Sequence, residues 1–228
     1  MITVLHGSYS EASRREFMRR KEEAKNKEIR TLDGRSLDGA GLTQALESQS
    51  MFGGDTIVFI ENLFGKLGRK VKLIEQLCQI LVRAGSSVDI VLWENKELGV
   101  TVVKSLPGAD VQQFKIPSVI FQILDGLAPS GSSHVLSLYT TLVQTEAPEL
   151  IFSMINRRVR QLIQIRDGVV PEGMQGWQAS RLTRQAKLFT IGTLLGMYKR
   201  LLSMECSIKN GSSPFTLAQL TEQFIIDL

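Results

Sequence analysis

The sequence predicts two units of different fold class: an α/β unit with a parallel sheet over residues 1–116 and an all-α unit over residues 117–228. In the first half, short apolar stretches of strand type alternate with helical stretches, which is the pattern of a parallel sheet with flanking helices. In the second half, every apolar pattern has a spacing of three to four residues, the period of a helix. The change comes at Pro117, which places the boundary near residues 115–118.

Five stretches of the first half have the composition of strands: residues 2–5, 28–32, 56–60, 88–93 and 111–114. The first is short and wholly apolar, and the second ends at Asp33-Gly34, a turn signal. The third alternates in polarity and is rich in β-branched residues, which favour strands. The fourth reads VDIVLW and is almost continuously apolar, as expected for a strand that is buried on both faces.

Four helical patterns separate these strands, over residues 11–27, 42–49, 71–82 and 100–105. The first is rich in Arg, Lys and Glu and has a thin apolar stripe that includes Phe17 and Met18. The third has apolar residues at 71, 74, 77, 78 and 81, which form one face of a helix. The fourth is short because Pro107-Gly108 ends it.

Six helical patterns fill the second half, over residues 119–127, 134–144, 149–166, 177–188, 193–207 and 217–228. The segments between them have loop composition, and most contain Gly or Pro, as in APSGSS and NGSSPF. Pro148 stands at the start of the third pattern, a position where a helix accepts proline.

The composition is that of an ordinary globular protein, with 43% hydrophobic and 22% charged residues. The apolar runs are far shorter than the roughly 20 residues of a membrane span, and no signal peptide is evident. We therefore expect a cytoplasmic protein with no membrane partner. Cys78 and Cys206 both lie on apolar helical patterns, so we expect two buried thiols and no disulfide. The two cysteines and two histidines have no metal-ligand spacing, and no metal is expected.

The net charge of +4 is unevenly distributed. Residues 157–200 hold nine basic residues against two acidic ones. Such a face can meet phosphate or an acidic partner, or it can be a solvated helix surface. Five basic residues are candidates for contact with DNA or a neighbouring subunit: Arg157, Arg158, Arg160, Arg184 and Lys187. We favour helix surface and subunit contact, because single-strand binders interleave aromatic residues with basic ones, and we expect Trp177 and Tyr198 in the core.

The stretch VLHGSYSEASRRE lies where nucleotide-binding α/β proteins hold phosphate, between a strand and a helix. A P-loop has the pattern G-x-x-x-x-G-K-[ST]. Gly7 fits the first position, but Ala12 and Ser13 stand where the second Gly and the Lys belong. We interpret this turn as one of nucleotide-binding ancestry that does not hydrolyse ATP, with weak phosphate contact by Arg14 or Arg15 left open.

No other catalytic pattern is present in the sequence. There is no G-x-S-x-G elbow, and His6 and His134 lie in different halves with no nucleophile motif beside them. We therefore predict no catalytic residue and no cofactor.

Four stretches, in this order, carry a family resemblance: VLHGSYSEASRRE, LTQALESQSMFGGDTIVFIEN, VDIVLWENKEL, and the run from FSMINRRVRQLIQIRDG through SRLTRQAKLFT to LLSMECSIKNG. Together they resemble the delta subunit of the bacterial DNA polymerase III clamp loader. The resemblance implies an AAA+-like α/β domain without a working P-loop over residues 1–116. It implies a helical collar domain for subunit assembly over residues 117–228.

The resemblance also implies a role for Met51 and Phe52, which precede Gly53-Gly54 at the end of a predicted helix. In this family such a hydrophobic pair enters a pocket on the ring-shaped sliding clamp, the beta subunit, and helps to open it during DNA replication. The implied partners are the sliding clamp, the other clamp-loader subunits and, indirectly or weakly, DNA. The pattern alone equally allows both residues to pack under the chain's own sheet.

The sequence departs from the family in several places. VQQFKIPSVIFQILDGL runs from the last strand directly into what resembles the first collar helix, so the chain looks like a shortened form without the lid domain. Asp55 stands where a basic residue is frequent, and Glu205 stands where the family tends to have Asp. Two other functions stay open: a phosphotransferase or ATPase with a degenerate P-loop, and a DNA-binding helper of the same ancestry without clamp contact.

Overall fold

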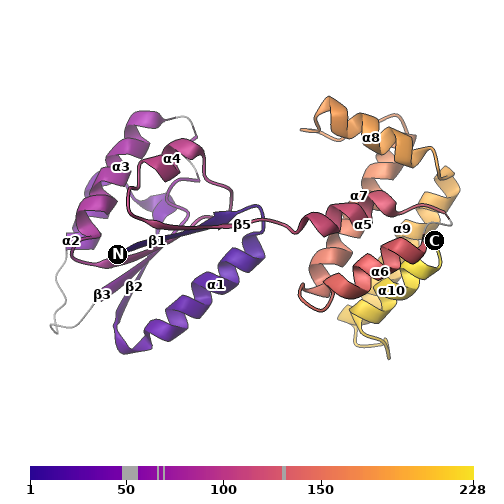
Figure 1. Cartoon of the computed structure of the whole chain (residues 1–228), viewed down its shortest axis with the longest axis horizontal. Helices are drawn as coiled ribbons and strands as arrows, with labels where there is room; N and C mark the ends of the chain where they lie inside the picture. The colour runs from indigo at the N-terminus through magenta and orange to yellow at the C-terminus, as the bar shows by residue number, and fades with distance from the viewer. Residues whose placement is uncertain (48–55, 66, 69, 130–131) are drawn as a thin grey trace. The chain divides into compact units, whose positions relative to one another are not determined.

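A computed structural model of the chain describes residues 1–47, 56–65, 67–68, 70–129 and 132–228. The chain divides into two compact units, Met1–Ile116 and Pro117–Leu228 (Figure 1). The first is a parallel sheet with flanking helices, and the described residues of the second form helices and the loops between them. The predicted fold class is therefore confirmed.

The sheet of the first unit has five strands: β1 (Ile2–Gly7), β2 (Glu28–Asp33), β3 (Thr56–Glu61), β4 (Asp89–Trp93) and β5 (Asp110–Phe114). Their order is β2-β3-β4-β1-β5, and every neighbouring pair is parallel. In the centre of the sheet, Val4 of β1 lies between Leu92 of β4 and Val111 of β5. Ile90, Val91 and Leu92 are buried, as the apolar composition of β4 predicts.

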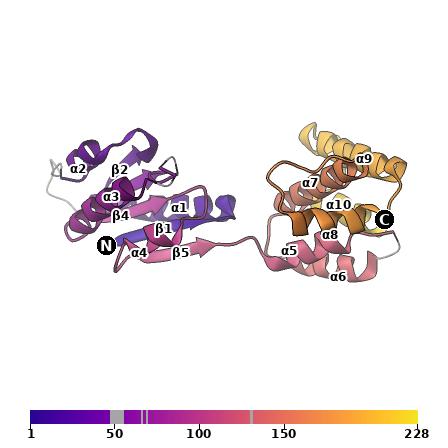
Figure 2. The same cartoon turned by 90° about the horizontal axis from the view of Figure 1, so that it is seen from above.

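Helices cover both faces of this sheet (Figures 1 and 2). The helix α1 (Ser10–Glu23) packs on one face, where Phe17 contacts Leu5, Phe59 and Val91. The helices α2 (Gly39–Glu47), α3 (Val71–Ala84) and α4 (Val100–Lys104) pack on the other face. The predicted stripe of α3 is buried at Ile74, Leu77, Cys78 and Leu81, whereas its first member, Val71, is exposed. Short 3-10 turns, η1 (Ala24–Asn26) and η2 (Gly34–Ser36), follow α1 and β2, so α1 is shorter than predicted.

The strand order reverses at β1, which lies between β4 and β5. The chain leaves β1 along α1 on one face and leaves β4 toward α4 on the other. Ligand sites of open α/β sheets form at such a reversal, outside the carboxyl ends of the strands. This edge is therefore the first place to look for a functional site.

The second unit consists, in its described residues, of six helices: α5 (Ser118–Gly126), α6 (Ser132–Leu142), α7 (Pro148–Arg166), α8 (Gly176–Ala186), α9 (Ile191–Lys209) and α10 (Leu217–Ile226). The longest of the buried stripes is on α7, which packs against α5, α8, α9 and α10. Pro148 occupies the first turn of α7, as predicted. Tyr139 on α6 donates a hydrogen bond of 2.8 Å to the Ala218 carbonyl on α10.

Two expectations about the core of this unit are wrong. Cys206 is exposed, although Cys78 in the first unit is buried. Trp177 is 67% exposed and lies outside the core. The buried stripe of α8 runs through Leu182, Gln185 and Ala186, and a residue five positions before Leu182 lies off that stripe. In the part of the chain that the structure describes, no helix is long and apolar enough to cross a membrane.

Candidate functional site at the carboxyl edge of the sheet

The turn after β1 is too short and too closely packed to be a phosphate loop. Only Ser8 and Tyr9 separate β1 from α1. The Tyr9 amide donates to the Phe114 carbonyl at 3.1 Å, which holds the turn against β5. Gly7 has φ +146°, and a Cβ there would lie 1.9 Å from the Phe114 oxygen. Gly7 therefore serves a close approach between two strands, not the cradle of a phosphate.

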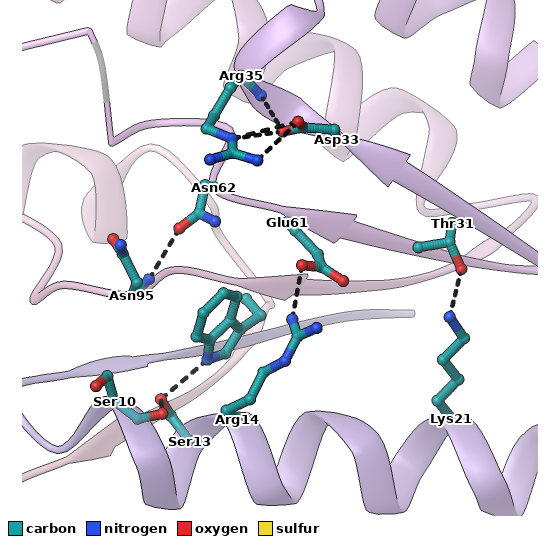
Figure 3. Close-up of polar contacts among 11 residues, drawn as sticks. Ser10, Ser13, Arg14, Lys21, Thr31, Asp33, Arg35, Glu61, Asn62 and Asn95 are labelled. Atoms are coloured by element: carbon teal, nitrogen blue, oxygen red, sulfur yellow. Dashed lines mark hydrogen bonds and ion pairs between the residues drawn. The ribbon is translucent and has the colours of Figure 1, made fainter.

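A basic side chain of the protein itself occupies this edge of the sheet (Figure 3). Arg14, on the second turn of α1, forms an ion pair of 2.7 Å with Glu61 at the end of β3. Its guanidinium carbon lies 4.6 Å from the centre of the Trp93 ring and 5.2 Å from that of Phe17. Stacking and ion pairing of this kind hold an arginine in place. This edge of the sheet thus already contains a cation, Arg14, paired with a carboxylate, Glu61.

Ser13, which stands where a P-loop has its lysine, is also engaged inside the unit. It is buried, and its hydroxyl accepts a hydrogen bond of 3.0 Å from the Trp93 indole N–H. The same hydroxyl donates to the Ser10 carbonyl at 2.9 Å. The described residues at this edge therefore do not fit a bound nucleoside triphosphate. Ser13 stands in place of the P-loop lysine, its hydroxyl is already hydrogen-bonded within the unit, and the loop is too short.

The turns after β3 and β4 are joined by hydrogen bonds at the same edge. The Asn62 amide donates to the Trp93 carbonyl at 2.8 Å, and the Asn95 amide donates to Asn62 Oδ1 at 3.1 Å (Figure 3). The Phe64 amide donates to Glu94 Oε1 at 2.7 Å. These contacts join the ends of two neighbouring strands. No sequence pattern predicts Glu94 or Trp93 in this role.

His6, at the end of β1, is buried and has a structural contact. Its Nδ1 accepts a hydrogen bond of 3.1 Å from the Leu98 amide. Burial lowers the pKa of this imidazole below its ordinary value, and the charge of Glu97 acts in the opposite direction. A neutral imidazole with an occupied Nδ1 fits the expectation of an ordinary core histidine.

Arg15, the other candidate for phosphate contact, is exposed beside an open groove of about 470 Å³. The groove is lined by residues from one side of α1 and from the end of β4: Ser10, Glu11, Arg14, Arg15, Met18, Trp93 and Asn95. Glu11 reduces the positive charge there, so the groove has no strong preference for anions.

The five predicted basic residues of the helical unit differ in their exposure to solvent. Arg157 and Arg160 are exposed on α7, and Arg184 and Lys187 are exposed on and just after α8. Arg158 instead points inward: it is 12% exposed and donates at 2.9 Å to both Asp125 Oδ1 and Gln185 Oε1. Its charge is paired with that of Asp125 within the unit.

Asp125 and Gln185 complete a polar network that sequence reasoning missed. Arg181 forms a second ion pair with Asp125, at 2.7 Å. The Gln185 amide nitrogen donates to the Leu124 and Leu127 carbonyls at 2.7 and 3.0 Å, which satisfies the C-terminal end of α5. The network joins α5, α7 and α8, and it gives a structural role to Arg181 and Gln185 of the segment SRLTRQA.

The outer face of α8 combines an aromatic residue with basic ones. Trp177, Arg181 and Arg184 follow one another at spacings of four and three residues, so they lie on one side of the helix, and all three are exposed. We call this set the α8 face. The Asp125 ion pair orients Arg181 on it.

A second exposed surface is an apolar strip on α9. Leu194, Met197, Leu201 and Met204 form the buried side of this helix. Ile191, Leu195 and Leu202 lie beside that side and are exposed. We call these three residues the α9 strip.

Met51 and Phe52 lie outside the described residues. The segment that contains them joins α2, which ends at Glu47, to β3, which begins at Thr56. Their predicted contact with a sliding clamp stays a prediction.

Comparison with known proteins gives similarity to solved structures only. No protein-family model matches the chain, and no curated protein sequence matches it. It is similar to the Bacillus subtilis DNA clamp loader delta protein (YqeN), with 14% identity, a TM-score of 0.47, and coverage of 99% of this chain and 94% of that one. It is also similar to a chain of Drosophila ORC bound to poly(dA/dT) DNA and Cdc6, with 12% identity, a TM-score of 0.32, and coverage of 98% and 51%.

Proposed function

We propose that the chain is a non-catalytic clamp-loader subunit, which binds a sliding clamp through Met51 and Phe52 and helps to open it during DNA replication. The observation that carries the non-catalytic part is at the carboxyl edge of the sheet, where Arg14 pairs with Glu61 and stacks on Trp93. The clamp-binding part rests on the sequence resemblance of the segment around Met51 and Phe52.

The mechanism uses binding energy and needs no hydrolysis by this chain. Burial of Met51 and Phe52 in a pocket contributes roughly 1.5–3 kcal/mol each before the cost of ordering. If these contacts are better with an open ring than with a closed one, they shift the population of the ring towards the open state. Partner subunits that use ATP would control when the pair is accessible.

The helical unit is the part that we assign to assembly with other loader subunits. The α9 strip supports this assignment, because exposed apolar residues in a row on one helix are typical of protein–protein interfaces. Four exposed basic residues of the same unit, Arg157, Arg160, Arg184 and Lys187, suit acidic residues on a neighbouring subunit.

The double variant M51A/F52A tests the clamp contact. We expect its affinity for the host's sliding clamp to fall roughly 100-fold or more, because about 3 kcal/mol or more of apolar contact is removed. Surface plasmon resonance with immobilised clamp measures the change. The matched control is M18A, which removes an exposed methionine from α1.

Equal clamp affinity of the wild type and M51A/F52A would contradict the proposal. Tight binding of Mg-ATP by the wild type would instead favour the degenerate ATPase or phosphotransferase.

A DNA-binding helper is the second candidate function, and the α8 face favours it. The prediction against single-strand contact rested on the expectation that no exposed aromatic residue lies among the basic ones. Trp177 is exposed and is interleaved with Arg181 and Arg184, so that reason no longer holds. A base can stack on the indole while the guanidinium groups meet phosphates.

For this candidate, W177A is expected to weaken binding of an oligothymidylate at low salt by roughly 5- to 100-fold, the effect of about 1–3 kcal/mol per stacked base. Fluorescence anisotropy of a labelled oligonucleotide measures it. The control is F215A, which removes another exposed aromatic side chain of the same unit. If W177A and F215A bind equally well, the α8 face has no role in stacking.

A further inference from the structure

Glu94 is a carboxyl group buried in the first unit, and the proposed function does not use it. It follows the last residue of β4 and is only 1% exposed. Its Oε1 accepts the hydrogen bond of 2.7 Å from the Phe64 amide. Its Oε2 is buried without a hydrogen-bond partner among the described residues. Buried polar atoms are normally satisfied, so this arrangement calls for a reason.

The Glu94 carboxyl group contacts the turn over residues 62–65, and the first residue of this turn has a strained backbone. Asn62 has φ +56°, and it is the one non-glycine residue with a positive φ in the described part of the chain. Leu63 and Phe64 follow it and are buried in the core between the sheet and α3. A Cβ on Gly65 would lie 3.5 Å from Glu94 Oε2, so the turn passes directly over the carboxyl group. The position of residues 63–65 therefore depends on their contacts with Glu94.

The two protonation states of this group have different requirements. A neutral carboxyl group can stay buried and still accept the Phe64 hydrogen bond through one oxygen. A carboxylate needs solvation or donors at both oxygens, and burial without them is costly. Opening of the turn admits water to Oε2, which removes this cost.

We propose that Glu94 and residues 62–65 form a proton-controlled latch, which is closed when the carboxyl group is neutral and is loosened when it ionises. The inference does not depend on the proposed function.

The electrostatics agree with this geometry. Burial raises the pKa of Glu94 to about 7, while the backbone N–H groups of Phe64, Leu63 and Gly65 act in the opposite direction. His6 is the residue before the last of β1, and the charge that acts on it is that of Glu97. Glu61 ends β3 and is paired with Arg14. Lys66 and Arg69, also in this loop, lie outside the described residues, and Lys70 precedes α3.

The sign of the effect follows from proton linkage. The closed turn holds the proton more tightly than the open turn, whose carboxyl group has the ordinary pKa of 4.5. The closed form is therefore favoured at low pH, and it loses this advantage as the pH rises from 4.5 through about 7.

Hydrogen exchange of the amides of Leu63, Phe64 and Gly65 in the full chain tests the latch. After correction for intrinsic exchange rates, we expect the opening constant to rise about tenfold between pH ~6 and ~8 in the wild type. E94Q should show no such rise, because its side chain does not titrate. The internal control is the Tyr9 amide, which donates to the Phe114 carbonyl and lies outside the latch.

Carbon-13 NMR of the side-chain carboxyl group in the wild type gives a second measurement that does not depend on a variant. A midpoint near neutral pH supports the latch. A midpoint near that of free glutamate, or the same pH dependence in E94Q as in the wild type, would overturn it.

Discussion

The variant D125A is expected to lower the free energy of unfolding of the helical unit by about 3 kcal/mol. Arg158 is 12% exposed, and loss of its carboxylate partner leaves a charge inside the unit. Breaking a buried pair from one side costs about 3–5 kcal/mol. The estimate lies at the lower end because Gln185 still accepts from Arg158, and because Asp125 near the C-terminal end of α5 is unfavourable to the helix dipole.

Urea unfolding of the full chain, followed by far-UV circular dichroism, measures this change. The matched control is D227A, since Asp227 also forms a pair with an arginine, Arg200, at the end of a helix but on the surface. Surface pairs contribute little, so D227A should change the unfolding transition far less. Equal effects of the two variants would mean that the Arg158 network contributes no more than a surface ion pair.

The second large effect is expected for F17A, which should destabilise the α/β unit by roughly 3–5 kcal/mol. Phe17 is fully buried beneath α1. Its ring meets that of Phe59 edge to face at a centroid distance of 5.2 Å and lies 6.1 Å from that of Trp93. A cavity there removes the main apolar contact of α1 with the sheet, and it removes a ring against which Arg14 packs.

The control for F17A is M18A, one residue further along α1, where the side chain is 42% exposed. A substitution at such a surface position changes stability by about 0.5 kcal/mol or less. Both variants are compared by urea unfolding with tryptophan fluorescence, to which Trp93 beside Phe17 contributes. If F17A and M18A unfold at the same urea concentration, Phe17 is not the main contact that holds α1.

The fold class could be predicted because it depends on local pattern. The apolar run of β4 and the stripe of α3 are set by the periods of strand and helix, and both are buried as expected. The order of the strands could not be read in the same way, because no local signal places β1 between β4 and β5. That order follows from tertiary packing of helices on both faces.

The candidate site was predicted only in part. The missing lysine and second glycine of a phosphate loop are visible in the sequence, but the pairing of Arg14 with Glu61 joins residues far apart in the chain. Arg158 was placed on the surface because arginine is usually exposed, and its partners Asp125 and Gln185 lie on other helices. Exposure of Trp177 and Cys206 did have a signal, since neither follows the spacing of the buried residues on its helix.

The short connection between β1 and α1 limits what substitution alone could do to this protein. Restoring Gly and Lys at positions 12 and 13 would place them inside the first turns of a helix that begins at Ser10. Gly7 would still be pressed against Phe114, and the added lysine would remove the hydroxyl that holds the Trp93 indole. A phosphate loop at this edge would therefore require inserted residues as well as exchanged ones, and point mutation alone would not build it.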